Sequence, residues 1–327
     1  MNMTASNKKR IGVLTSGGDA PGMNAAIRAV VRAGIYYGYD VFGIENGYSG
    51  LLAGDISPMT LRSVSEIINR GGTILKTSRS PEFNTPEGVN RGAEMARLFK
   101  LDGLVVIGGD GSFRGARDLA KKGIPVSCIP GTIDNDISCT DYTIGYDTAL
   151  NTVKDAIDRI KDTAYSHERC SIIEVMGRGA GYIALNCAIA GGAEACVLPE
   201  KPLDIDEDVI KPIIDGRNRG KDHFIIVAAE GVGKTDEIAA EIKAKVGITP
   251  TVSILGYIQR GGSPTVRDRV TGSLMGVKAV ELLHSGNINQ VVASHSGQII
   301  GLPIDEALAM PKTISEYEIL ASTILSL

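Results

Sequence analysis

The chain has 327 residues, of which 34 are Lys or Arg and 38 are Asp or Glu, so its formal net charge at pH 7 is −4. A balance this close to neutral argues against a nucleic-acid coat or a polybasic membrane anchor, because both need a surplus of basic residues. An apolar fraction of 43% and a charged fraction of 22% are typical of a soluble globular protein, and at about 150 residues per domain the length allows two domains.

The sequence is expected to lack targeting and membrane-spanning segments. Residues 1–10 are polar and basic with no apolar stretch behind them, which argues against a secretory signal. The most apolar long stretch, 182–198, is interrupted by Asn186, two glycines and Glu194, so it is too short and too polar to span a bilayer. Five scattered cysteines without a CxxC pair favour reduced core thiols over disulfides or a zinc site. We therefore expect a cytoplasmic protein that binds neither nucleic acid nor membrane.

Strand-like and helix-like segments alternate along the chain. After the short apolar run 11–14, residues 24–37 carry apolar side chains at helical spacing. The run 104–107 is continuously apolar, as expected of a strand covered on both faces, and a helical stretch follows it. The other strand-like runs each precede a loop or a helix: 124–129, 171–175, 224–228, 252–255 and 290–293. This βαβα order predicts parallel sheets with helices on both faces, where ligands bind beyond the carboxyl ends of the strands.

Glycine-rich loops follow two of these strands. Residues 15–24 (TSGGDAPGMN) join the first strand to the first helix. Their backbone N–H groups and the free donors of a helix N-terminus favour phosphate binding, with a tight, ordinarily capped turn as the alternative. The loop 108–112 (GGDGS) repeats the arrangement and adds a carboxylate, Asp110. Because an acid repels a polyphosphate unless a cation lies between them, this loop favours Mg²⁺ over a solvated turn aspartate.

Two acids lie in the segment 130–136 (PGTIDND), which follows the next strand-like run. If this segment is extended, Asp134 and Asp136 share a side. One of them could then accept a proton from an attacking hydroxyl while the other helps to hold the metal. A pair of helix N-cap residues is the alternative, since a helix follows.

Several arginines and one further acid lie near the loops. Arg79, Arg169, Arg178 and Arg260 share the ability to bind phosphate oxygens bidentately, although a surface ion pair is the alternative for each. Glu230 follows an apolar strand, where it could accept hydrogen bonds from a polyol or simply occupy a turn. No Ser-His-Asp pattern emerges. Together these residues predict magnesium-dependent phosphoryl transfer, in which catalysis is mostly positioning and charge stabilisation.

Several long motifs, in order, closely resemble those of the bacterial ATP-dependent 6-phosphofructokinases, the phosphofructokinase A family. They are IGVLTSGGDAPGMN, GGDGS, PGTIDND, DYTIGYDTAL, IIEVMGR and GYIQRGGSP. The similarity begins near Lys9 and continues into the C-terminal region, where the match is less clear. The resemblance implies an allosteric, homotetrameric kinase of glycolysis. It would transfer the γ-phosphate of ATP to the 1-hydroxyl of fructose 6-phosphate and give fructose 1,6-bisphosphate.

The resemblance also implies an architecture. We predict an α/β protein of two lobes, each a largely parallel, Rossmann-like sheet with helices on both faces, with nucleotide and sugar at the lobe interface. Residues 1–145, with a returning segment near 255–305, would form mainly the nucleotide-binding lobe. Residues 146–254 would form mainly the sugar-phosphate-binding lobe, and a C-terminal helix over 306–327 would pack across.

By motif, the resemblance implies four sets of binding residues. ATP would be held by Gly17, Arg79, Ser80, Gly109, Asp110, Gly111 and Ser112. The sugar phosphate would be bound by Thr132, Asp134, Asp136, Arg169, Met176, Gly177, Arg178, Glu230, Tyr257 and Arg260. Mg²⁺ would be bound by Asp110 and Asp136. An effector such as ADP or phosphoenolpyruvate would meet Arg28, Arg32, Lys161, Glu194, Arg219 and Lys221, although Leu61 replaces one usual arginine of that pocket.

The resemblance implies catalytic roles for three of these residues. Asp134 would be the catalytic base with Thr132 beside it, and Arg178 would stabilise the transferred charge. The 6-phosphate of the sugar would be bound by Arg260 and by Arg169, which would reach in from a neighbouring subunit.

The chain departs from the family pattern at three positions. Thr251 stands where the family usually has an arginine for the 6-phosphate, Tyr257 replaces a usual histidine, and Lys76 replaces a usual glycine. A lost charged hydrogen bond costs about 1.5–3 kcal/mol, so a different sugar phosphate is an alternative acceptor and a catalytically weak regulatory paralogue is a further alternative. Pyrophosphate-dependent relatives typically carry Asp and Lys at the places of Gly111 and Gly131, so both glycines favour ATP as donor.

Overall fold

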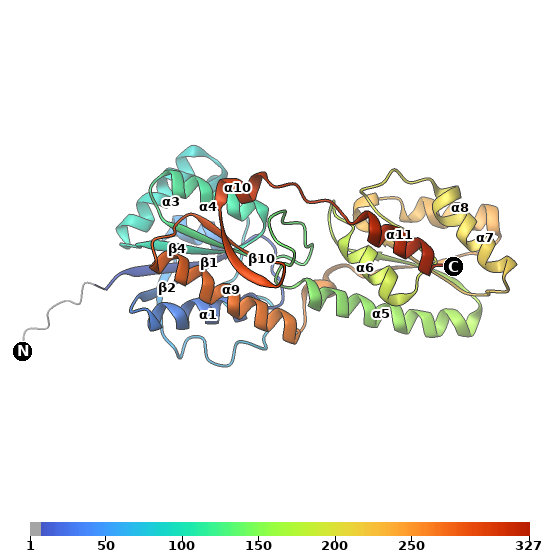
Figure 1. Ribbon diagram of the computed structural model, residues 1–327, viewed down its shortest axis with the longest axis horizontal. Helices are drawn as coiled ribbons and strands as arrows, with labels where there is room; N and C mark the ends of the chain where they lie inside the picture. The colour runs from blue at the N-terminus through green and yellow to red at the C-terminus, as the bar shows by residue number, and fades with distance from the viewer. Residues whose placement is uncertain (1–7) are drawn as a thin grey trace, which may run out of the picture. The chain divides into compact units, whose positions relative to one another are not determined.

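The chain folds into two compact units in the computed structural model, which describes residues 8–327 (Figure 1). Unit 1 is built from three stretches of the described chain: 8–132, 137–145 and 260–311. Unit 2 is built from three others: 133–136, 146–259 and 312–327. The chain therefore passes from one unit to the other repeatedly. Most of the polar segment 1–10, which argues against a secretory signal, lies outside the described residues.

Unit 1 contains a seven-stranded sheet in the order β11-β10-β5-β4-β1-β2-β3. Its strands are β1 (Arg10–Ser16), β2 (Asp40–Ile44), β3 (Ile56–Met59), β4 (Gly103–Gly108), β5 (Val126–Pro130), β10 (Gln290–His295) and β11 (Gln298–Pro303). The five inner strands run parallel, whereas the edge strands β3 and β11 pair antiparallel. Every residue of β4 is buried, which confirms the prediction of a strand covered on both faces.

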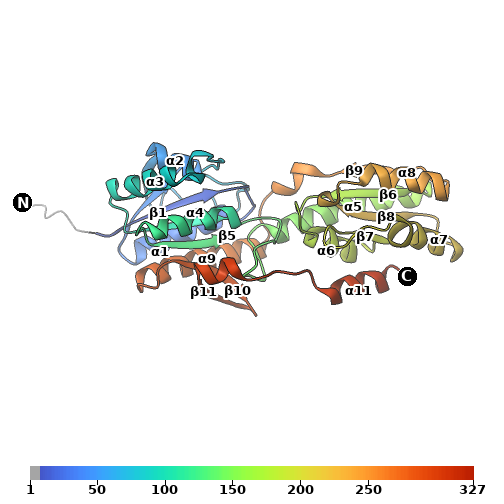
Figure 2. The same ribbon diagram turned by 90° about the horizontal axis from the view of Figure 1, so that it is seen from above.

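Helices cover both faces of this sheet (Figures 1 and 2). They are α1 (Met23–Tyr36), α2 (Gly47–Ala53), α3 (Pro86–Leu98), α4 (Asp110–Lys121), α9 (Val266–His284) and α10 (Ile304–Ala309), with a 3₁₀ turn η1 (Glu82–Asn84). Helices α1 and α9 pack against each other on one face, while α3 and α4 lie on the other. A Cβ added at Gly276 of α9 would lie 2.6 Å from Ala29 Cβ of α1, so glycine is what allows this close packing.

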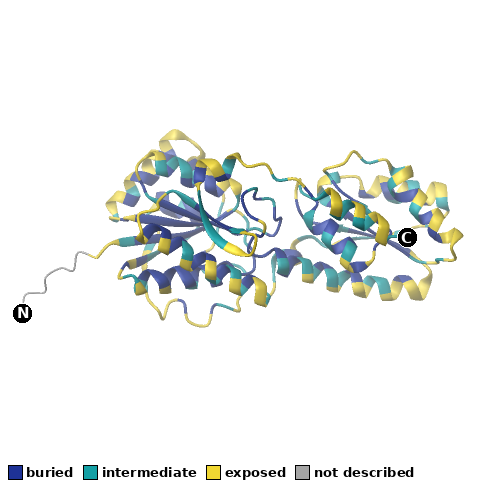
Figure 3. Ribbon diagram, viewed as in Figure 1, coloured by how far each residue is buried: buried dark blue, intermediate teal, exposed yellow. Residues whose placement is uncertain are grey.

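Unit 2 contains a four-stranded, fully parallel sheet in the order β7-β8-β6-β9. Its strands are β6 (Cys170–Val175), β7 (Ala195–Val197), β8 (Phe224–Ala229) and β9 (Thr251–Ile254). Its helices are α5 (Tyr146–His167), α6 (Tyr182–Gly191), α7 (Lys211–Asn218), α8 (Thr235–Val246) and α11 (Glu316–Leu325), with short helical turns η2 (Asp206–Ile210), η3 (Glu230–Val232) and η4 (Gly256–Arg260). In both units the strands are mostly buried and the outer helix faces exposed (Figure 3). The predicted α/β fold with largely parallel sheets is therefore confirmed.

The C-terminal region differs from the single helix expected over 306–327. It forms α10 in unit 1 and α11 in unit 2, separated by residues 310–315. The break has a local cause, because Pro311 has no N–H to donate and disfavours helical geometry in the residue before it. Met310 accordingly has extended dihedral angles, with φ −65° and ψ 137°.

The five cysteines, all within the described residues, are not joined in disulfides. Four of the five are buried and Cys196 is partly buried. The apolar stretch 182–198 forms α6 and β7 within unit 2. Among the helices of residues 8–327, none combines the length and the hydropathy that a membrane crossing would require.

Candidate active site

Three neighbouring strands of unit 1 end in the loops that the sequence analysis singled out. Strands β5, β4 and β1 lie side by side and parallel, so the loops after them leave from the same edge of the sheet. The loops also contact one another, because the Gly131 N–H donates to the Gly108 carbonyl at 3.0 Å. A Cβ added at Gly17 would lie 3.5 Å from Ser112 Oγ and 4.0 Å from Gly109 N. Unit 1 therefore brings these loops together as predicted.

The glycines of the loop after β4 fall into two kinds. A Cβ added at Gly108 would lie 2.3 Å from the Ser16 carbonyl oxygen, so packing within the protein requires glycine there. A Cβ added at Gly109 or Gly111 would meet no atom within 4 Å. Neither of those two residues has a positive φ. The fold does not explain the small size of Gly109 and Gly111, whereas close approach of a ligand would.

Helix α4 begins directly at this loop. Its N-cap is Gly109, which has no side chain to bond the N–H groups of the first turn. A helix N-terminus attracts anions through these N–H groups and through the helix dipole. Ser112 is buried in the first turn, with its backbone N–H donating to the Gly109 carbonyl at 3.0 Å. The residues present therefore suit a phosphate group.

Asp110 is the only acid in the first turn of α4. Its half-exposed carboxylate pairs with Arg114, one turn later, through Nε at 2.8 Å and Nη2 at 3.3 Å. In the described part of the chain, no three His, Cys, Asp or Glu residues are grouped as a metal site. Mg²⁺ at phosphate sites usually takes only one or two protein carboxylates and keeps waters and phosphate oxygens as its other ligands. A single exposed carboxylate beside a phosphate loop fits that pattern.

The segment carrying Arg79 and Ser80 is tied to the end of β1. The Thr77 hydroxyl donates to the Gly17 carbonyl at 2.7 Å, and the Thr15 hydroxyl donates to the Lys76 carbonyl at 2.8 Å. Lys76 itself has φ 55°, a left-handed conformation that explains why glycine would be favoured there. These bonds place the Arg79 segment beside the Gly17 loop.

The segment 130–136 is not the extended run that the sequence analysis considered. Asn135 has φ 51°, so the period-two rule that put Asp134 and Asp136 on one side does not apply. The helix-cap alternative is also wrong, because the next helix, α5, begins only at Tyr146. Thr132 belongs to unit 1, whereas Asp134 and Asp136 belong to unit 2. Asp134 is almost completely buried, whereas Asp136 is only partly buried.

Within unit 2, Asp134 lies beside Arg178. The distance from Arg178 Nε to Asp134 Oδ2 is 3.4 Å, with side chains that are 58% and 2% exposed respectively. Arg178 lies in the loop 176–181 between β6 and α6 and has φ 54°. A buried carboxylate and a cation that faces solvent thus form a pair, as the base and charge-stabilising roles would require.

The loop 176–181 is held by oxygen atoms of three side chains. The Met176 N–H donates to Gln259 Oε1 at 3.1 Å. The Gly177 and Arg178 N–H groups both donate to Glu230 Oε1, at 3.2 and 2.9 Å. The last bond runs from the Gly181 N–H to Glu200 Oε1 at 2.7 Å.

Of these three acceptors, the sequence analysis names only Glu230 as a candidate site residue, and it does not name the other two. We predict Glu230 as a sugar contact, and in the structure one of its two carboxylate oxygens accepts from the loop. Gln259, which is fully buried, lies inside the GYIQRGGSP motif and could have been noticed there. Glu200 lies in no quoted motif, and no sequence signal pointed to it.

The residues predicted to bind the 6-phosphate do not gather within one unit. Arg260 lies in unit 1, where its Nη1 donates to the Asp19 carbonyl at 3.4 Å and occupies the space beside Gly18. Arg169 precedes β6 whereas Arg178 follows it, so the two lie at opposite ends of one strand. Tyr257 is 81% exposed.

The predicted effector residues also divide between the units. Arg28 and Arg32 lie on α1 of unit 1, where burial and the neighbouring Arg32 lower the pKa of Arg28. In unit 2 the Lys221 ammonium pairs with the buried Glu194 carboxylate. Lys161 donates to the Gly191 carbonyl at 3.0 Å, at the end of α6. The remaining predicted residue, Arg219 of unit 2, is exposed, as is Leu61 of unit 1, which replaces a usual arginine.

Comparisons with known proteins agree with the motifs. A family profile described as "Phosphofructokinase" matches residues 10–283. ATP-dependent 6-phosphofructokinase 1 of Clostridium perfringens is 54% identical over 308 residues, which cover 94% of this chain and 96% of that protein. ATP-dependent 6-phosphofructokinase of Clostridium botulinum is 54% identical over 97% of this chain and 99% of its own length.

A solved structure of phosphofructokinase from Saccharomyces cerevisiae matches with a TM-score of 0.84 and 35% identity. The match covers 92% of this chain and 45% of the yeast chain, so this chain spans about half the length of that relative. Together with the family profile over most of the sequence and the two clostridial relatives, these findings show that the chain belongs to the phosphofructokinase family.

Proposed function

We propose that this protein is an ATP-dependent 6-phosphofructokinase that phosphorylates the 1-hydroxyl of fructose 6-phosphate. The observation that carries the proposal is the pair formed by the buried Asp134 carboxylate and the Arg178 guanidinium, 3.4 Å apart. This pair supplies the two functions that the reaction needs from side chains, a base for the alcohol and a cation for the transferred charge.

In this proposal the loops of unit 1 hold ATP. The N–H groups at the start of α4 bind phosphate oxygens, and the open space at Gly109 and Gly111 lets the triphosphate approach the backbone. Arg79, Ser80 and Ser112 add side-chain contacts. Gly111 leaves room for the nucleotide, which supports ATP over pyrophosphate as the donor. Gly131 does not add to this support, because a Cβ there would lie 3.1 Å from Met23 Cε and 3.2 Å from Ile107 Cγ2, so packing within the protein explains its small size.

Asp110 would hold Mg²⁺ in this site, after its carboxylate leaves Arg114. When bound, the metal would neutralise charge on the phosphate oxygens. Asp136 of unit 2 is proposed as a second carboxylate for it. Because the start of α4 offers Mg²⁺ only one carboxylate, the metal would bind there together with the nucleotide rather than alone.

In unit 2, Asp134 would accept the proton of the 1-hydroxyl as the oxygen attacks the γ-phosphorus. Arg178 would stabilise the charge that develops on the transferred group. Because Glu230 Oε1 already accepts two backbone N–H groups, only its second oxygen would be available to a sugar hydroxyl. Met176, Gly177 and Tyr257 are proposed as further sugar contacts, with Thr132 of unit 1 beside the base.

The 6-phosphate is the part of the substrate for which the chain differs from its family pattern. Arg260 and an Arg169 from a neighbouring subunit are proposed to bind it in a homotetramer. Thr251 is exposed on β9 and offers a neutral hydroxyl where an arginine would offer charge. This observation favours a second candidate function, in which the same catalytic residues act on another phosphorylated sugar.

The oligomer, the effector response and the location follow from the family proposal. We place the enzyme in the cytoplasm, where glycolysis runs, as an allosteric homotetramer. In unit 2 the proposed effector anion would meet Lys161, Arg219 and Lys221, with Glu194 as the acid that already pairs with Lys221.

A donor-and-acceptor assay tests the proposal. Purified enzyme with Mg²⁺ is given ATP or pyrophosphate and a panel of sugar phosphates, and product formation is measured with coupling enzymes. Fructose 6-phosphate with ATP is expected to give the highest kcat/KM. A different best acceptor would support the second candidate, and sugar-phosphate binding by calorimetry without ADP release would refute an enzymatic role.

A further inference from the structure

We infer that Glu200 is a positioning residue for the proposed phosphoryl transfer, and that it acts by fixing the loop 176–181 that presents Arg178. The inference deepens the proposed function and rests on it. Its carboxylate is the last of the three side-chain acceptors along the loop, and it bonds the Gly181 N–H at 2.7 Å. The other end of the loop is held by Gln259 and Glu230.

The loop needs outside support because its own conformation is unfavourable. Arg178 has φ 54°, in a region that costs a residue with a side chain about 1–2 kcal/mol. Gly177 has φ 143°, and a Cβ there would lie 2.3 Å from the Ala180 carbonyl oxygen. Within the loop itself, the Ala180 N–H donates to the Gly177 carbonyl at 2.9 Å. A strained turn of this kind persists when several contacts with the surrounding structure hold it in place, and such turns are common at functional sites.

The loop is shaped to receive the Glu200 carboxylate. Gly181 is the N-cap of α6, so a carboxylate at its N–H also meets the positive end of the helix dipole. A Cβ at Gly181 would lie 2.6 Å from Glu200 Oε2 and 2.7 Å from Leu198 Cδ2. Glycine at 181 therefore allows the carboxylate to approach the backbone this closely.

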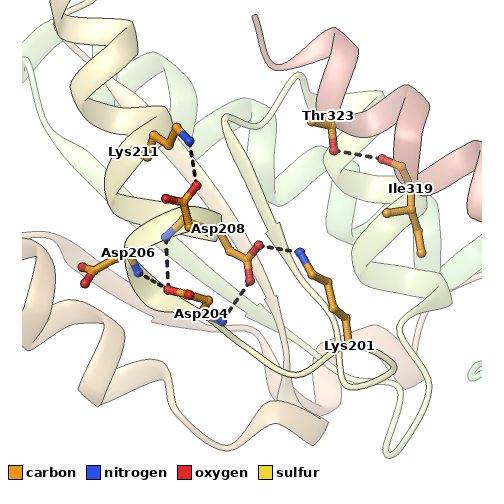
Figure 4. Close-up of polar contacts among 8 residues, drawn as sticks. Lys201, Asp204, Asp206, Asp208, Lys211, Ile319 and Thr323 are labelled. Atoms are coloured by element: carbon orange, nitrogen blue, oxygen red, sulfur yellow. Dashed lines mark hydrogen bonds and ion pairs between the residues drawn. The ribbon is translucent and has the colours of Figure 1, made fainter.

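The segment that carries Glu200 is itself firmly held. Lys201, the next residue, pairs with Asp208 Oδ1 at 2.6 Å, and Asp208 Oδ2 accepts from the Asp204 N–H at 3.0 Å (Figure 4). Asp204 in turn accepts from the N–H groups of Asp206 and Glu207 at 3.1 and 3.2 Å. Glu200 thus connects a fixed turn after β7 to the loop that positions Arg178.

Glu200 is not part of the hydrophobic core. Its side chain is exposed and lines a cavity of about 610 Å³, together with Asp136, Tyr182, Lys312 and Glu316. Removing its carboxylate leaves no buried void, so a loss of activity on substitution would not follow from lost packing. Glu316 lines the same cavity from α11 and provides a control of equal charge.

Steady-state kinetics of Glu200→Ala test the inference. Misplacement of a catalytic group by about 1 Å can reduce the rate by roughly 100-fold, so we expect kcat to fall by about 10- to 100-fold. KM for ATP and for the acceptor should stay within about twofold, because Arg178 acts on charge that appears in the transition state. Glu200→Gln, whose amide oxygen can still accept from Gly181, should recover most of the rate. Glu316→Ala should match the wild type.

A double-mutant cycle shows whether Glu200 acts through Arg178. Adding Glu200→Ala to Arg178→Ala should cause no further loss of kcat, because the group that it positions is already absent. An equal loss in both backgrounds would overturn the inference, as would a wild-type kcat for Glu200→Ala. Thermal unfolding of each variant identifies a misfolded one. If Glu200→Ala misfolds, Glu200→Leu, which keeps a side chain of similar size but offers no acceptor, serves as the test variant.

Hydrogen exchange provides a readout that does not depend on activity. The amides of 177–181 should exchange faster in Glu200→Ala and at the wild-type rate in Glu316→Ala. Unchanged exchange in Glu200→Ala would refute the anchoring role. If the wild type fails to phosphorylate fructose 6-phosphate, the proposed function is refuted. The hydrogen-exchange measurement would still decide the role of Glu200, as would the double-mutant cycle repeated with the best acceptor found.

Discussion

The Arg178 guanidinium and the Asp134 carboxylate form an ion pair, 3.4 Å from Nε to Oδ2, in which only the arginine is exposed to solvent. Burial of an isolated carboxylate is costly, and the neighbouring cation offsets part of that cost. Both residues are contributed by loops of unit 2. A carboxylate that is screened from water and lies beside a cation is suited to act as a base on an alcohol.

Asp134→Ser should therefore reduce kcat by about 10²–10⁴-fold, the usual contribution of a general base, with a smaller effect on KM. Initial rates at saturating ATP and acceptor give the comparison. Asp158→Ser, on the exposed face of α5, removes the same charge and should leave kcat unchanged. Near-wild-type turnover of Asp134→Ser would remove this residue from the base role.

Alanine at Gly108 and at Gly111 should have opposite effects on stability. Gly108→Ala places a Cβ 2.3 Å from a backbone oxygen and should lower the free energy of unfolding by about 1–3 kcal/mol. Gly111→Ala meets no protein atom and replaces glycine in a helix, so it should raise stability by about 0.5–1 kcal/mol. Urea denaturation of the two variants checks both expectations.

The same Gly111→Ala variant tests where ATP binds. Its methyl group would occupy space that we assign to the triphosphate, so KM for ATP should rise by roughly tenfold, equivalent to about 1.4 kcal/mol. Stability and nucleotide affinity would then change in opposite directions. An unchanged KM for ATP would place the triphosphate elsewhere.

Thr251→Arg should strengthen binding of fructose 6-phosphate. A charged hydrogen bond contributes about 1.5–3 kcal/mol, so KM for this substrate should fall by about tenfold or more while kcat changes little. Thr249→Arg adds the same charge two residues earlier, before β9 begins, and serves as the control. If both variants lower KM equally, the effect is one of general charge and the 6-phosphate is bound elsewhere.

The buried thiols make the fold sensitive to alkaline pH. Burial, with a smaller contribution from nearby Glu194, raises the pKa of the Cys170 thiol to about 12. In the unfolded chain a cysteine titrates near 8.5, so above that pH the unfolded state loses a proton that the folded state keeps. The free energy of unfolding should therefore fall by up to about 1.4 kcal/mol per pH unit from 8.5 toward 12.

Denaturation at pH 7.5 and 9.5 measures this contribution. The decrease in unfolding free energy between the two pH values should be smaller in Cys170→Ala than in the wild type, because the variant lacks the titrating group. An equal decrease in both proteins would contradict the assignment to Cys170.

The strands and helices that position the loops could be predicted because their signals are local. The apolar run 104–107 became β4, and residues 24–37 lie over α1. The edge strands β3 and β11 were missed, since β3 has four residues, contains Pro58 and has no buried position. Short edge strands owe their pairing to the neighbouring strand, and such a contact leaves little trace in the sequence.

The candidate site was predictable at the level of its loops but not of its contacts. The glycine motifs predicted which strand ends carry the loops that meet at one edge of the unit 1 sheet. The left-handed Asn135 and Arg178, in contrast, are imposed by tertiary contacts, and propensity alone would not place either there. The contact made by Glu200 could not be predicted either. Glu200 is a single acid outside every motif, and only the structure shows that it bonds the Gly181 N–H.

The stretch 133–136, which carries Asp134, belongs to unit 2 but is flanked on both sides by chain of unit 1. The two units are consequently interleaved in sequence, and no single truncation yields a fragment that holds one complete unit and nothing of the other. A gene fragment ending at residue 132 would encode the loops proposed to bind phosphate without Asp134, the proposed base. Fusion or duplication of this protein would therefore have to preserve the whole reading frame to keep both units complete.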